Sequence, residues 1–222
     1  MSERLRATGL AKRFAGVPAV DAVRAASLTV AAGETLLVRG PSGAGKTTLL
    51  ALLGGLLRPD CGSILLDGVD LAHQGETARR RRRATEIGFV FQRGLLLEAL
   101  TVRENLLLVA QAIGQHGEGG ARADALLERL GLAARAGAFP ATLSAGECQR
   151  AAVARALMLR PAVVLADEPT AHLDAASGAA VVTALRALVR EEGSALIAVT
   201  HDARLDGIAD RVAHMEDGVL RT

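Results

Sequence analysis

The stretch GPSGAGKTT contains residue types and a spacing that could bind the phosphates of a nucleotide. Glycines at three of its positions allow the backbone to curl, so that successive N–H groups can surround a phosphate. Lys46 can reach the β- and γ-phosphates, and the Thr47 hydroxyl can bind Mg²⁺ beside them. The pattern G-x-x-x-x-G-K-[ST], between a strand-like and a helix-like run, is that of a phosphate-binding loop. We therefore predict a nucleotide site at Gly40, Pro41, Ser42, Gly43, Ala44, Gly45, Lys46, Thr47 and Thr48.

Two adjacent acids end an apolar run further along the chain, in VVLADEP. A buried strand that ends in an acid can deliver a carboxylate to Mg²⁺ at a phosphate-binding loop, and we expect Asp167 to bind the metal. Glu168 follows at once and points elsewhere, so it is the candidate to orient or deprotonate an attacking water. The alternative is that both acids only end a strand, but the phosphate-binding loop upstream favours the magnesium site.

A second candidate anion site lies in LSAGECQR. Ser144, Ala145 and Gly146 leave a bare backbone where a helix should begin, and the free N–H groups and the helix dipole favour an anion there. Ser144 with Glu147 three residues later also has the pattern of a capping box, and we expect both features. The chain thus contains two helix starts suited to phosphate, although one loop would suffice for one nucleotide.

Length and composition limit the alternatives. A chain of 222 residues, 50% of them hydrophobic, is long enough for one domain with a large core, which we expect to span residues 1–222. The net charge of +2 gives no reason to expect nucleic acid as a partner. Cys61 and Cys148 have no metal-site spacing, and we expect buried thiols in a reducing compartment. The N-terminus has no signal-peptide core, and no apolar run is long enough to span a membrane, so we expect a chain that is soluble alone.

Apolar runs and their breaks predict alternating strands and helices. Strands are expected at 27–30, 35–40, 63–68, 86–92, 162–168 and 195–202, helices at 46–57 and 177–192, and a final hairpin within 212–220. Between 101 and 160 the pattern is helical. We infer an α/β core with a helical subdomain inserted at about 98–160, before the strand that ends at Asp167.

Five consecutive arginines occupy positions 79–83. Basic runs can bind nucleic acid, but no aromatic residues are interleaved here to stack on bases. We expect a solvated surface segment that precedes the strand at 86–92. Proximity to anionic lipid headgroups is the alternative.

Together these motifs resemble the ATP-binding-cassette (ABC) ATPases over nearly the whole chain. The phosphate-binding loop, LSAGE, LADEP, AHLD and VTHD occur in the order and approximate spacing of that family. The resemblance implies ATP and Mg²⁺ as cofactors and an α/β P-loop NTPase core of the ABC ATPase type. It also implies an inserted helical subdomain and an N-terminal antiparallel β-subdomain.

The resemblance implies roles for three further residues. Gln92 closes IGFVFQ where the family has a glutamine that couples Mg²⁺ and water to a membrane partner; a plain strand end is the alternative. His201, in VTHD, resembles the histidine that touches the γ-phosphate, again with a strand end as the alternative. Phe14 stands where an aromatic residue usually stacks on adenine, although it could belong only to the core. The other four histidines show no metal-site spacing and are expected at the surface: His73, His116, His172 and His214.

In the ABC family two cassettes pair head to tail, and each lends its LSGGQ-like helix start to the nucleotide held by the other. The resemblance implies that Ser144 and the backbone of Gly146 contact a γ-phosphate across the interface. Asp174 resembles an aspartate that reaches across the dimer, with a simple helix cap as the alternative. Ala145 replaces the usual glycine and would weaken the closed dimer if its φ is positive. Glu147 replaces glutamine, as in some transport cassettes.

A narrower resemblance is to the ATPase subunits for lipoprotein release, macrolide or peptide efflux and bacterial division, carried by LLALLGGLLRPDCGSILLDG, IGFVFQ and VLADEPTAHLD. Leu96-Leu97-Glu98 departs from the Leu-Leu-Pro common in that branch, and His172 stands where a small residue or Asn is expected. The branch implies a second copy or a homologous cassette and an integral membrane permease as partners. The expected location is peripheral, at the cytoplasmic face of the inner membrane.

The alternative function is a soluble, non-transport ABC ATPase that acts on nucleic acid or ribosomes. Such proteins usually carry two cassettes in one chain or long insertions, and this sequence has neither. We therefore expect no nucleic acid as a partner.

Overall fold

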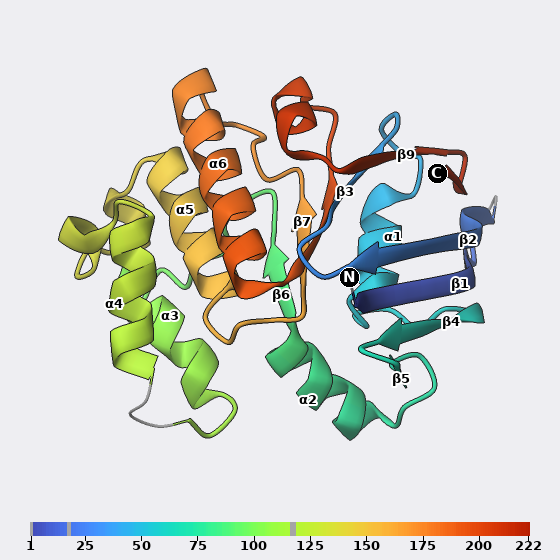
Figure 1. The fold of residues 1–222 in the computed structure, drawn as a ribbon, viewed down its shortest axis with the longest axis horizontal. Coiled ribbons are helices and arrows are strands. Elements are labelled where there is room, and N and C mark those ends of the chain that lie inside the picture. The colour runs from blue at the N-terminus through green and yellow to red at the C-terminus, as the bar shows by residue number, and fades with distance from the viewer. Residues whose placement is uncertain (1, 17–18, 116–118) are drawn as a thin grey trace.

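The computed structural model describes residues 2–16, 19–115 and 119–222. The chain forms two sheets and a set of helices that pack on them (Figure 1). The strands are β1 (Glu3–Phe14), β2 (Val20–Ala31), β3 (Thr35–Arg39), β4 (Cys61–Leu66), β5 (Val69–Asp70), β6 (Ile87–Val90), β7 (Val163–Asp167), β8 (Ala195–Val199), β9 (Arg211–Glu216) and β10 (Val219–Arg221). The α-helices are α1 (Lys46–Leu53), α2 (Glu76–Glu86), α3 (Val102–Gln111), α4 (Gly119–Arg129), α5 (Ala145–Ala156) and α6 (Ala175–Glu192). Short 3₁₀ helices are η1 (Ala133–Arg135), η2 (Pro140–Thr142) and η3 (Ala203–Ile208).

The central sheet has the strand order β10-β9-β3-β8-β7-β6. Its strands β9, β3, β8, β7 and β6 pair in parallel, and β10 pairs antiparallel to β9. Val199 of β8 lies opposite Val38 of β3 and also opposite Asp167 of β7, so these three strands end at the same level. The loops that follow them therefore leave the sheet side by side, at the edge where α/β sheets bind ligands.

Neighbouring residues on the central strands belong to two different cores, because side chains alternate between the faces of a sheet. Val163 and Leu165 pack in the core that contains α1 and the antiparallel sheet. Val164 and Ala166 pack in the core that contains α3, α4, α5 and α6. All four residues are fully buried, at 0% exposure. Coverage on both faces explains why these strands are short, continuous apolar runs in the sequence.

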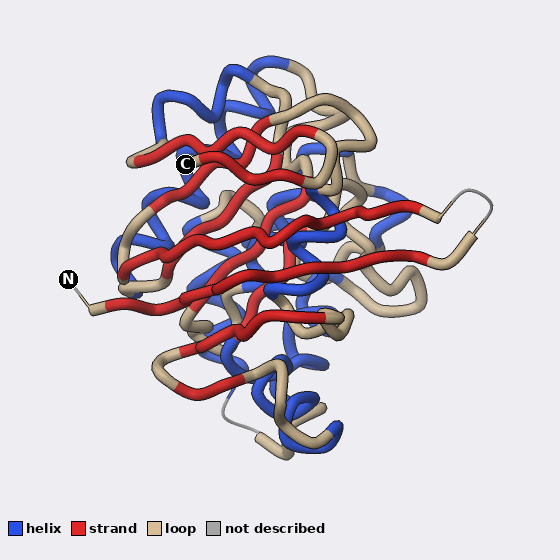
Figure 2. Tube along the Cα trace, turned by 90° about the vertical axis from the view of Figure 1, so that its right-hand side faces the viewer, coloured by secondary structure: helices blue, strands red, loops and turns tan. Residues whose placement is uncertain are grey.

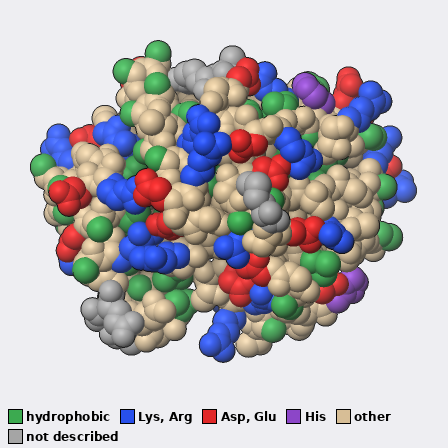
Figure 3. All heavy atoms as spheres, in the orientation of Figure 1, with side chains coloured by type: hydrophobic (Ala, Val, Ile, Leu, Met, Phe, Trp, Pro, Cys, Tyr) green, Lys and Arg blue, Asp and Glu red, His purple; other side chains and the backbone are tan. Residues whose placement is uncertain are grey.

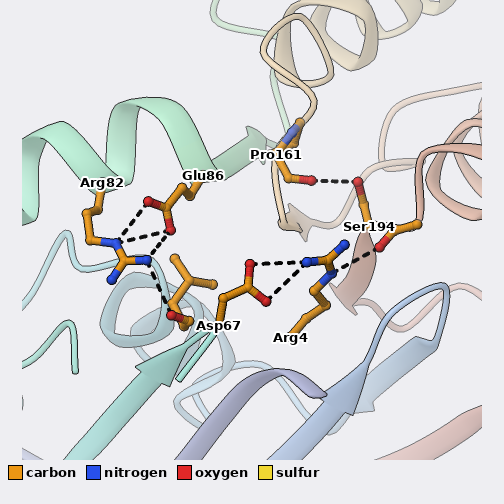
Figure 4. Close-up of polar contacts among 8 residues, drawn as sticks. Arg4, Asp67, Arg82, Glu86, Pro161 and Ser194 are labelled. Carbon is orange, nitrogen blue, oxygen red and sulfur yellow. Dashed lines mark hydrogen bonds and ion pairs between the residues drawn. The ribbon is translucent and has the colours of Figure 1, made fainter. Parts of the chain in front are cut away.

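The antiparallel sheet has the order β2-β1-β4-β5, and its long strands β1 and β2 are seen side by side in Figure 2. Arg4 of β1 fastens this sheet to the central one. Its guanidinium donates to both carboxylate oxygens of Asp67 at 3.2 Å and to the carbonyl of Gly193, before β8, also at 3.2 Å (Figure 4). Nearby, the Ser194 hydroxyl donates to the carbonyl of Pro161 at 2.6 Å, which ties the starts of β8 and β7 together.

The chain between β6 and β7 forms α3, α4 and α5, which lie together at the left of Figure 1. Ion pairs Arg122–Glu192 and Arg129–Glu191 join α4 to the end of α6. Arg122 also donates to the carbonyl of Leu157 at 2.9 Å. The helices are thus attached to α6, and the division of residues 98–160 as a separate subdomain stays a prediction.

Most predicted elements are present, with differences at their ends. The predicted strands at 35–40, 63–68, 86–92, 162–168 and 195–202 are confirmed as β3, β4, β6, β7 and β8, and the final hairpin as β9 and β10. The helix expected at 46–57 ends earlier, at Leu53, because Gly54 caps it and Gly55 adopts a φ of +64°. The sequence pattern does not predict β1. A shift of register between Ala7 and Leu10, around Gly9 at a φ of +60°, breaks its alternation.

The arginine run forms part of helix α2. Arg79 is 7% exposed, and both Arg79 and Arg82 pair with acids of their own helix. Arg83 donates to the carbonyl of Gly55 at 3.0 Å, which fastens α2 to the loop after α1. The expectation of a solvated segment is therefore wrong for this inward side, and residues 80–81 alone of the run are exposed.

Both cysteines are more accessible than the sequence predicts. Cys61 is exposed, and Cys148 is half-buried in α5, so the expectation of a buried thiol is wrong for Cys61. Cys61 is the first residue of β4, opposite Ala11, where the pairing with β1 begins.

Within the described residues, no helix is both long enough and apolar enough to cross a membrane.

We expect the two cores to contribute independently to stability. Val163→Ala and Val164→Ala each remove buried methyl groups, so each should lower the free energy of unfolding by about 1–3 kcal/mol. Because the two side chains face different cores, the effects in the double variant should add to within about 0.5 kcal/mol. Denaturant unfolding of the single and double variants measures this. The pair Val163→Ala and Leu165→Ala, within one core, is the contrast, and a coupling above about 1 kcal/mol between Val163 and Val164 would contradict separate cores.

Candidate functional site

A cleft of about 1140 Å³ opens where the parallel strands end. The loop after β3, the ends of β7 and β8 and the segment after β6 all contribute to its walls. Most of the residues predicted from the sequence line it: Phe14, Gly40, Pro41, Ser42, Gly43, Gly45, Lys46, Thr47, Thr48, Gln92, Asp167, Glu168 and His201. The strand order thus gathers side chains that lie far apart in the sequence.

Helix α1 begins at this cleft without a capping side chain. Its N-cap residue is Gly45, at a φ of +98°, and no acidic residue lies in its first turn. By contrast, α3, α5 and α6 are each capped by a side chain, from Thr101, Ser144 and Asp174. The first N–H groups of α1 are therefore left for an anion, and the residues present fit the phosphates of a nucleotide.

The loop before α1 is built from glycines for reasons of space. A Cβ on Gly40 would lie 1.9 Å from the carbonyl oxygen of Met215, and a Cβ on Gly45 would lie 2.0 Å from that of Ala22. Lys46 crosses the loop, and its Nζ donates to the carbonyls of Gly40 at 2.8 Å and Pro41 at 2.9 Å. The ammonium is thus held beside the free N–H groups of the loop. Ala44 packs its side chain in the core and can contribute only its backbone to the cleft.

Asp167 lies at the end of β7, beside the start of α1. Burial raises its pKa, and the hydrogen bond from the Thr47 side chain opposes that shift. The neighbouring Glu168 charge also raises the pKa, whereas the Lys46 charge lowers it. A hydroxyl and a carboxylate that already touch form a donor set of oxygens, the kind that Mg²⁺ prefers.

Glu168 is held in one orientation by the end of β8. Its carboxylate accepts a hydrogen bond from the Thr200 hydroxyl at 3.1 Å and contacts Nδ1 of His201 at 2.8 Å. Its side chain is 14% exposed, whereas that of His201 is 77% exposed. Glu168 also has a φ of +46°, a conformation that costs energy for a residue other than glycine and is typical of functional sites. A carboxylate so oriented can accept a proton from a water in the cleft.

Two side chains of α5 fix the backbone around Gln92. Gln149, which is 3% exposed, donates to the carbonyl of Phe91 at 3.0 Å. The Arg155 guanidinium donates to the carbonyls of Gly94 at 2.9 Å and Leu95 at 2.6 Å. The segment after β6 is therefore anchored to α5, and none of these hydrogen bonds involves the side chain of Gln92.

Phe14 lies on the wall of the cleft and not in the core. The residue is 40% exposed, and the ammonium of Lys12 lies 5.9 Å from the centre of its ring. An exposed aromatic ring at the rim of a cleft can stack on a planar ligand.

Several residues that line the cleft belong to none of the sequence motifs. They come from the β1–β2 hairpin and the turn between β9 and β10, which meet where Arg24 N–H donates to the carbonyl of Gly218 at 2.7 Å. No local signal in the sequence brings these two turns together. The residues are Ala19, Val20, Asp21, Ala22, Arg24, Asp217 and Gly218.

Four histidines have no predicted role, and three of them lie within the described residues. His73, His172 and His214 are exposed, as expected, and His116 lies outside the described residues. Of these, His172 contacts the predicted site: its Nε2 lies 3.2 Å from the side-chain nitrogen of Gln92.

The start of α5 has the predicted capping box. The Ser144 hydroxyl accepts from the Glu147 N–H at 3.2 Å, and the Glu147 carboxylate accepts from the Ser144 N–H at 2.8 Å. These bonds to Ser144, and the ion pair with Arg135, lower the pKa of Glu147. Ala145 is the first helical residue, and its φ is not positive, so the expected penalty for replacing glycine does not arise. The N–H groups of Ala145 and Gly146 are not used by the box.

The start of α5 does not face the cleft of its own chain. Among the described residues that line the cleft, Ser144, Gly146 and Asp174 are absent. Gly146 instead packs against the first turn of α6, where a Cβ on it would lie 2.8 Å from Oγ and 2.9 Å from Cβ of Ser177. Asp174 caps that turn by accepting from the Ser177 N–H at 2.9 Å. The two helix starts are therefore fitted to each other, and these residues do not line the cleft that contains the phosphate-binding loop.

A profile of the family described as ABC transporter matches residues 23–171, the greater part of the chain. The lipoprotein-releasing system ATP-binding protein LolD of Ruegeria sp. is 44% identical over 225 residues, which cover 99% of both chains. The macrolide export ATP-binding/permease protein MacB of Rhodospirillum rubrum is 45% identical over 90% of this chain and 31% of that longer protein. Among solved structures, the dimeric ATP-binding cassette MJ0796 bound to ADP and phosphate matches with a TM-score of 0.88 and 31% identity, over 96% of this chain and 95% of that chain.

The close fit between α5 and α6 leads to a stability prediction. Gly146→Ala should lower the free energy of unfolding by about 1–3 kcal/mol, because the new methyl group collides with Ser177. Ser177→Gly in the same chain removes both colliding atoms, Oγ and Cβ, and should recover more of this loss than Ser177→Ala, which removes only Oγ. Thermal unfolding of the six chains, with each Ser177 change also made alone, gives the coupling energies. Equal coupling for the two Ser177 changes would mean that the Cβ contact is unimportant.

Proposed function

The chain belongs to the ABC transporter family and hydrolyses ATP, and on that premise we propose that it is the nucleotide-binding subunit of a membrane transporter, working as a head-to-tail pair of cassettes. Each cassette would bind ATP with Mg²⁺ in its own cleft and complete the cleft of the other. The pair would drive an integral membrane partner in export or in lipoprotein or peptide handling.

One observation carries the two-chain proposal: the start of α5 lies outside the cleft of its own chain. The cleft holds a phosphate-binding loop, two carboxylates, a histidine and a glutamine, but Ser144 and Gly146 do not line it. In a two-fold pair, the start of α5 in each chain would contact the cleft of the other. Both clefts would then be closed by the same contact, as an isologous dimer requires. Solved structures of a similar cassette are dimeric, which supports the proposal that two chains pair.

Within one cleft, the N–H groups of the loop and Lys46 would hold the phosphates, and Thr47, Asp167 and Gln92 would hold Mg²⁺. When bound, Mg²⁺ supplies charge neutralisation for phosphoryl transfer. Glu168 would accept the proton of the attacking water, and His201 would keep that carboxylate oriented and reach towards the γ-phosphate. Phe14 would stack on adenine. From the other chain, Ser144 and the Gly146 N–H would contact the γ-phosphate, with Asp174 beside them.

A second cavity, of about 400 Å³, lies between the segment after β6, η2 and the start of α5, and it offers a docking place for the membrane partner. Leu95 and Leu97, which are 60% and 50% exposed, would supply apolar contact surface to such a partner. A partner segment there would touch the backbone that Gln149 and Arg155 hold. The subunit would then sit at the cytoplasmic face of the inner membrane. Relatives are named for lipoprotein release and for macrolide export, so the cargo would be chosen by the partner.

The alternative, a soluble cassette that acts on nucleic acid or ribosomes, finds less support. On the face shown in Figure 3, basic and acidic side chains are interspersed, so that face presents no continuous basic surface. Most of the arginine run is engaged within the molecule. A phosphate backbone is bound mainly by clustered basic side chains, and these are what that function requires.

Mixing two inactive variants tests the exchange of helix starts. Lys46→Ala should lose productive nucleotide binding, and Ser144→Arg should block the contact that serves the other chain. In a mixed pair, one cleft combines the intact loop of the Ser144→Arg chain with the intact α5 start of the Lys46→Ala chain. Such a cleft can be active only if each site is shared between two chains. We expect equimolar mixing to restore part of the ATPase rate, at most about the fraction of mixed pairs. Each variant mixed with itself is the control, and no recovery at any ratio would contradict the shared site.

Glu168→Gln should separate binding from hydrolysis. The amide keeps the shape of the side chain but cannot accept a proton, so the ATPase rate should fall by roughly 10²–10⁴-fold. Binding of MgATP should persist, because the loop, Lys46, Thr47 and Asp167 are unchanged. Size-exclusion chromatography with MgATP should then show a stable dimer that the wild type forms only transiently. If Asp167→Asn gave the trapped dimer instead, the roles of the two carboxylates would be reversed.

A further inference from the structure

The side chain of Gln92 lies on the boundary between two cavities. It lines the nucleotide cleft with Asp167 and His201, and it also lines the second cavity. On the second side its carboxamide nitrogen lies 3.2 Å from Nε2 of His172. A side chain at such a boundary can serve either cavity, and a contact in one holds it back from the other.

The contact between Gln92 and His172 is possible in either orientation of the amide. With the carboxamide nitrogen facing the ring, the ring nitrogen accepts an N–H of the carboxamide. If the amide is turned by half a rotation, its oxygen accepts an N–H of the ring instead. In both cases one hydrogen bond fixes the Gln92 side chain.

The backbone directs the imidazole towards Gln92 at some cost. His172 has a φ of +67°, the left-handed region in which residues other than glycine are strained. The turn that contains it is closed by the Leu173 N–H, which donates to the carbonyl of Thr170 at 3.2 Å, and the turn before it by the Ala171 N–H, which donates to the carbonyl of Glu168 at 3.0 Å. Two residues further on, Asp174 caps α6. His172 therefore sits on a short, well-defined link between Glu168 and the start of α6.

The backbone of Gln92, in turn, is fixed on the opposite side by Gln149 and Arg155 of α5. The two anchors hold the chain on either side of Gln92 but do not touch its carboxamide. A change of contact at this residue is therefore a rotation of its side chain between His172 and the nucleotide cleft.

We propose that His172 is a positioning residue that holds the Gln92 carboxamide at the second cavity until a magnesium–nucleotide complex draws it into the cleft. The inference rests on the proposed function, in which Gln92 serves Mg²⁺. Because His172 also lines the second cavity, its contact with Gln92 would couple a partner bound there to the nucleotide cleft. A partner segment that displaces the imidazole there would release Gln92 to the nucleotide.

The dependence of ATP hydrolysis on Mg²⁺ concentration gives the first test. His172→Ala and His172→Gly should both lower the half-saturating Mg²⁺ concentration by roughly two- to tenfold, the value of one hydrogen bond. Both remove the imidazole, but only glycine relieves the left-handed backbone. Similar shifts in the two variants indicate the contact, whereas a shift in the glycine variant alone would overturn the proposal. His73→Ala, which removes an exposed histidine bonded to Asp70, is the matched control and should have no effect.

The same change in a Gln92→Ala chain shows whether His172 acts through Gln92. In that background His172→Ala should leave the Mg²⁺ dependence unchanged, because the side chain that it positions is gone. An equal shift in both backgrounds would overturn the proposal.

A readout without nucleotide separates this inference from the proposed function. The ¹⁵N chemical shifts of the His172 ring, measured by NMR on the nucleotide-free chain, should change in Gln92→Ala and stay constant in Gln111→Ala, which removes an exposed glutamine of α3 that lines neither cavity. Ring shifts that are the same with and without Gln92 would overturn the contact itself. Failure of the wild-type chain to hydrolyse ATP would instead overturn the proposed function. The NMR measurement would still decide whether Gln92 and His172 are in contact.

Discussion

The hydrogen-bond register of four parallel strands is the constraint on which the site depends. Val38, Val199 and Asp167 lie opposite one another across β3, β8 and β7, and Val90 of β6 lies opposite Ala166. A shift of one residue in any strand would turn its buried side chains to the other core and move its last residue away from the cleft. The phosphate-binding loop, His201, Asp167 with Glu168, and Gln92 are neighbours because these strands end together.

The helices divide the work of the site between two places. Helix α1 has no cap of its own and offers its first turn to the cleft, whereas α5 is capped by its own Ser144 and packs on α6. Through Gln149 and Arg155, α5 also holds the segment of Gln92. In the proposed pair, a displacement of α5 would therefore reach the side of the cleft where we propose that Mg²⁺ binds and, at the same time, the helix start that we propose serves the other chain. This double attachment gives a physical route by which a partner at the second cavity could act on both nucleotides.

Short buried strands and the residues at their ends could be predicted from the sequence because each is a local pattern. The run that ends in Asp167 and Glu168, the glycine loop and the capping box of Ser144 are examples, and each lies where its pattern places it. Other features depend on contacts between distant segments. The alternation of strand β1 is broken at Gly9, the wall formed by Arg24 and Asp217 needs two hairpins to meet, and the buried position of Arg79 depends on its packing beside Gly55, after α1. No local pattern contains that information.

The structure of the Glu168→Gln chain with MgATP tests the shared site most directly. The distance to measure joins the Ser144 hydroxyl oxygen and the nearest γ-phosphate oxygen. If two chains exchange helix starts, this oxygen lies within hydrogen-bond distance, about 2.7–3.0 Å, of the nucleotide bound by the other chain. The nucleotide of its own chain then remains far from Ser144. A γ-phosphate contacted by Ser144 of the same chain, or by no α5 start at all, would contradict the account.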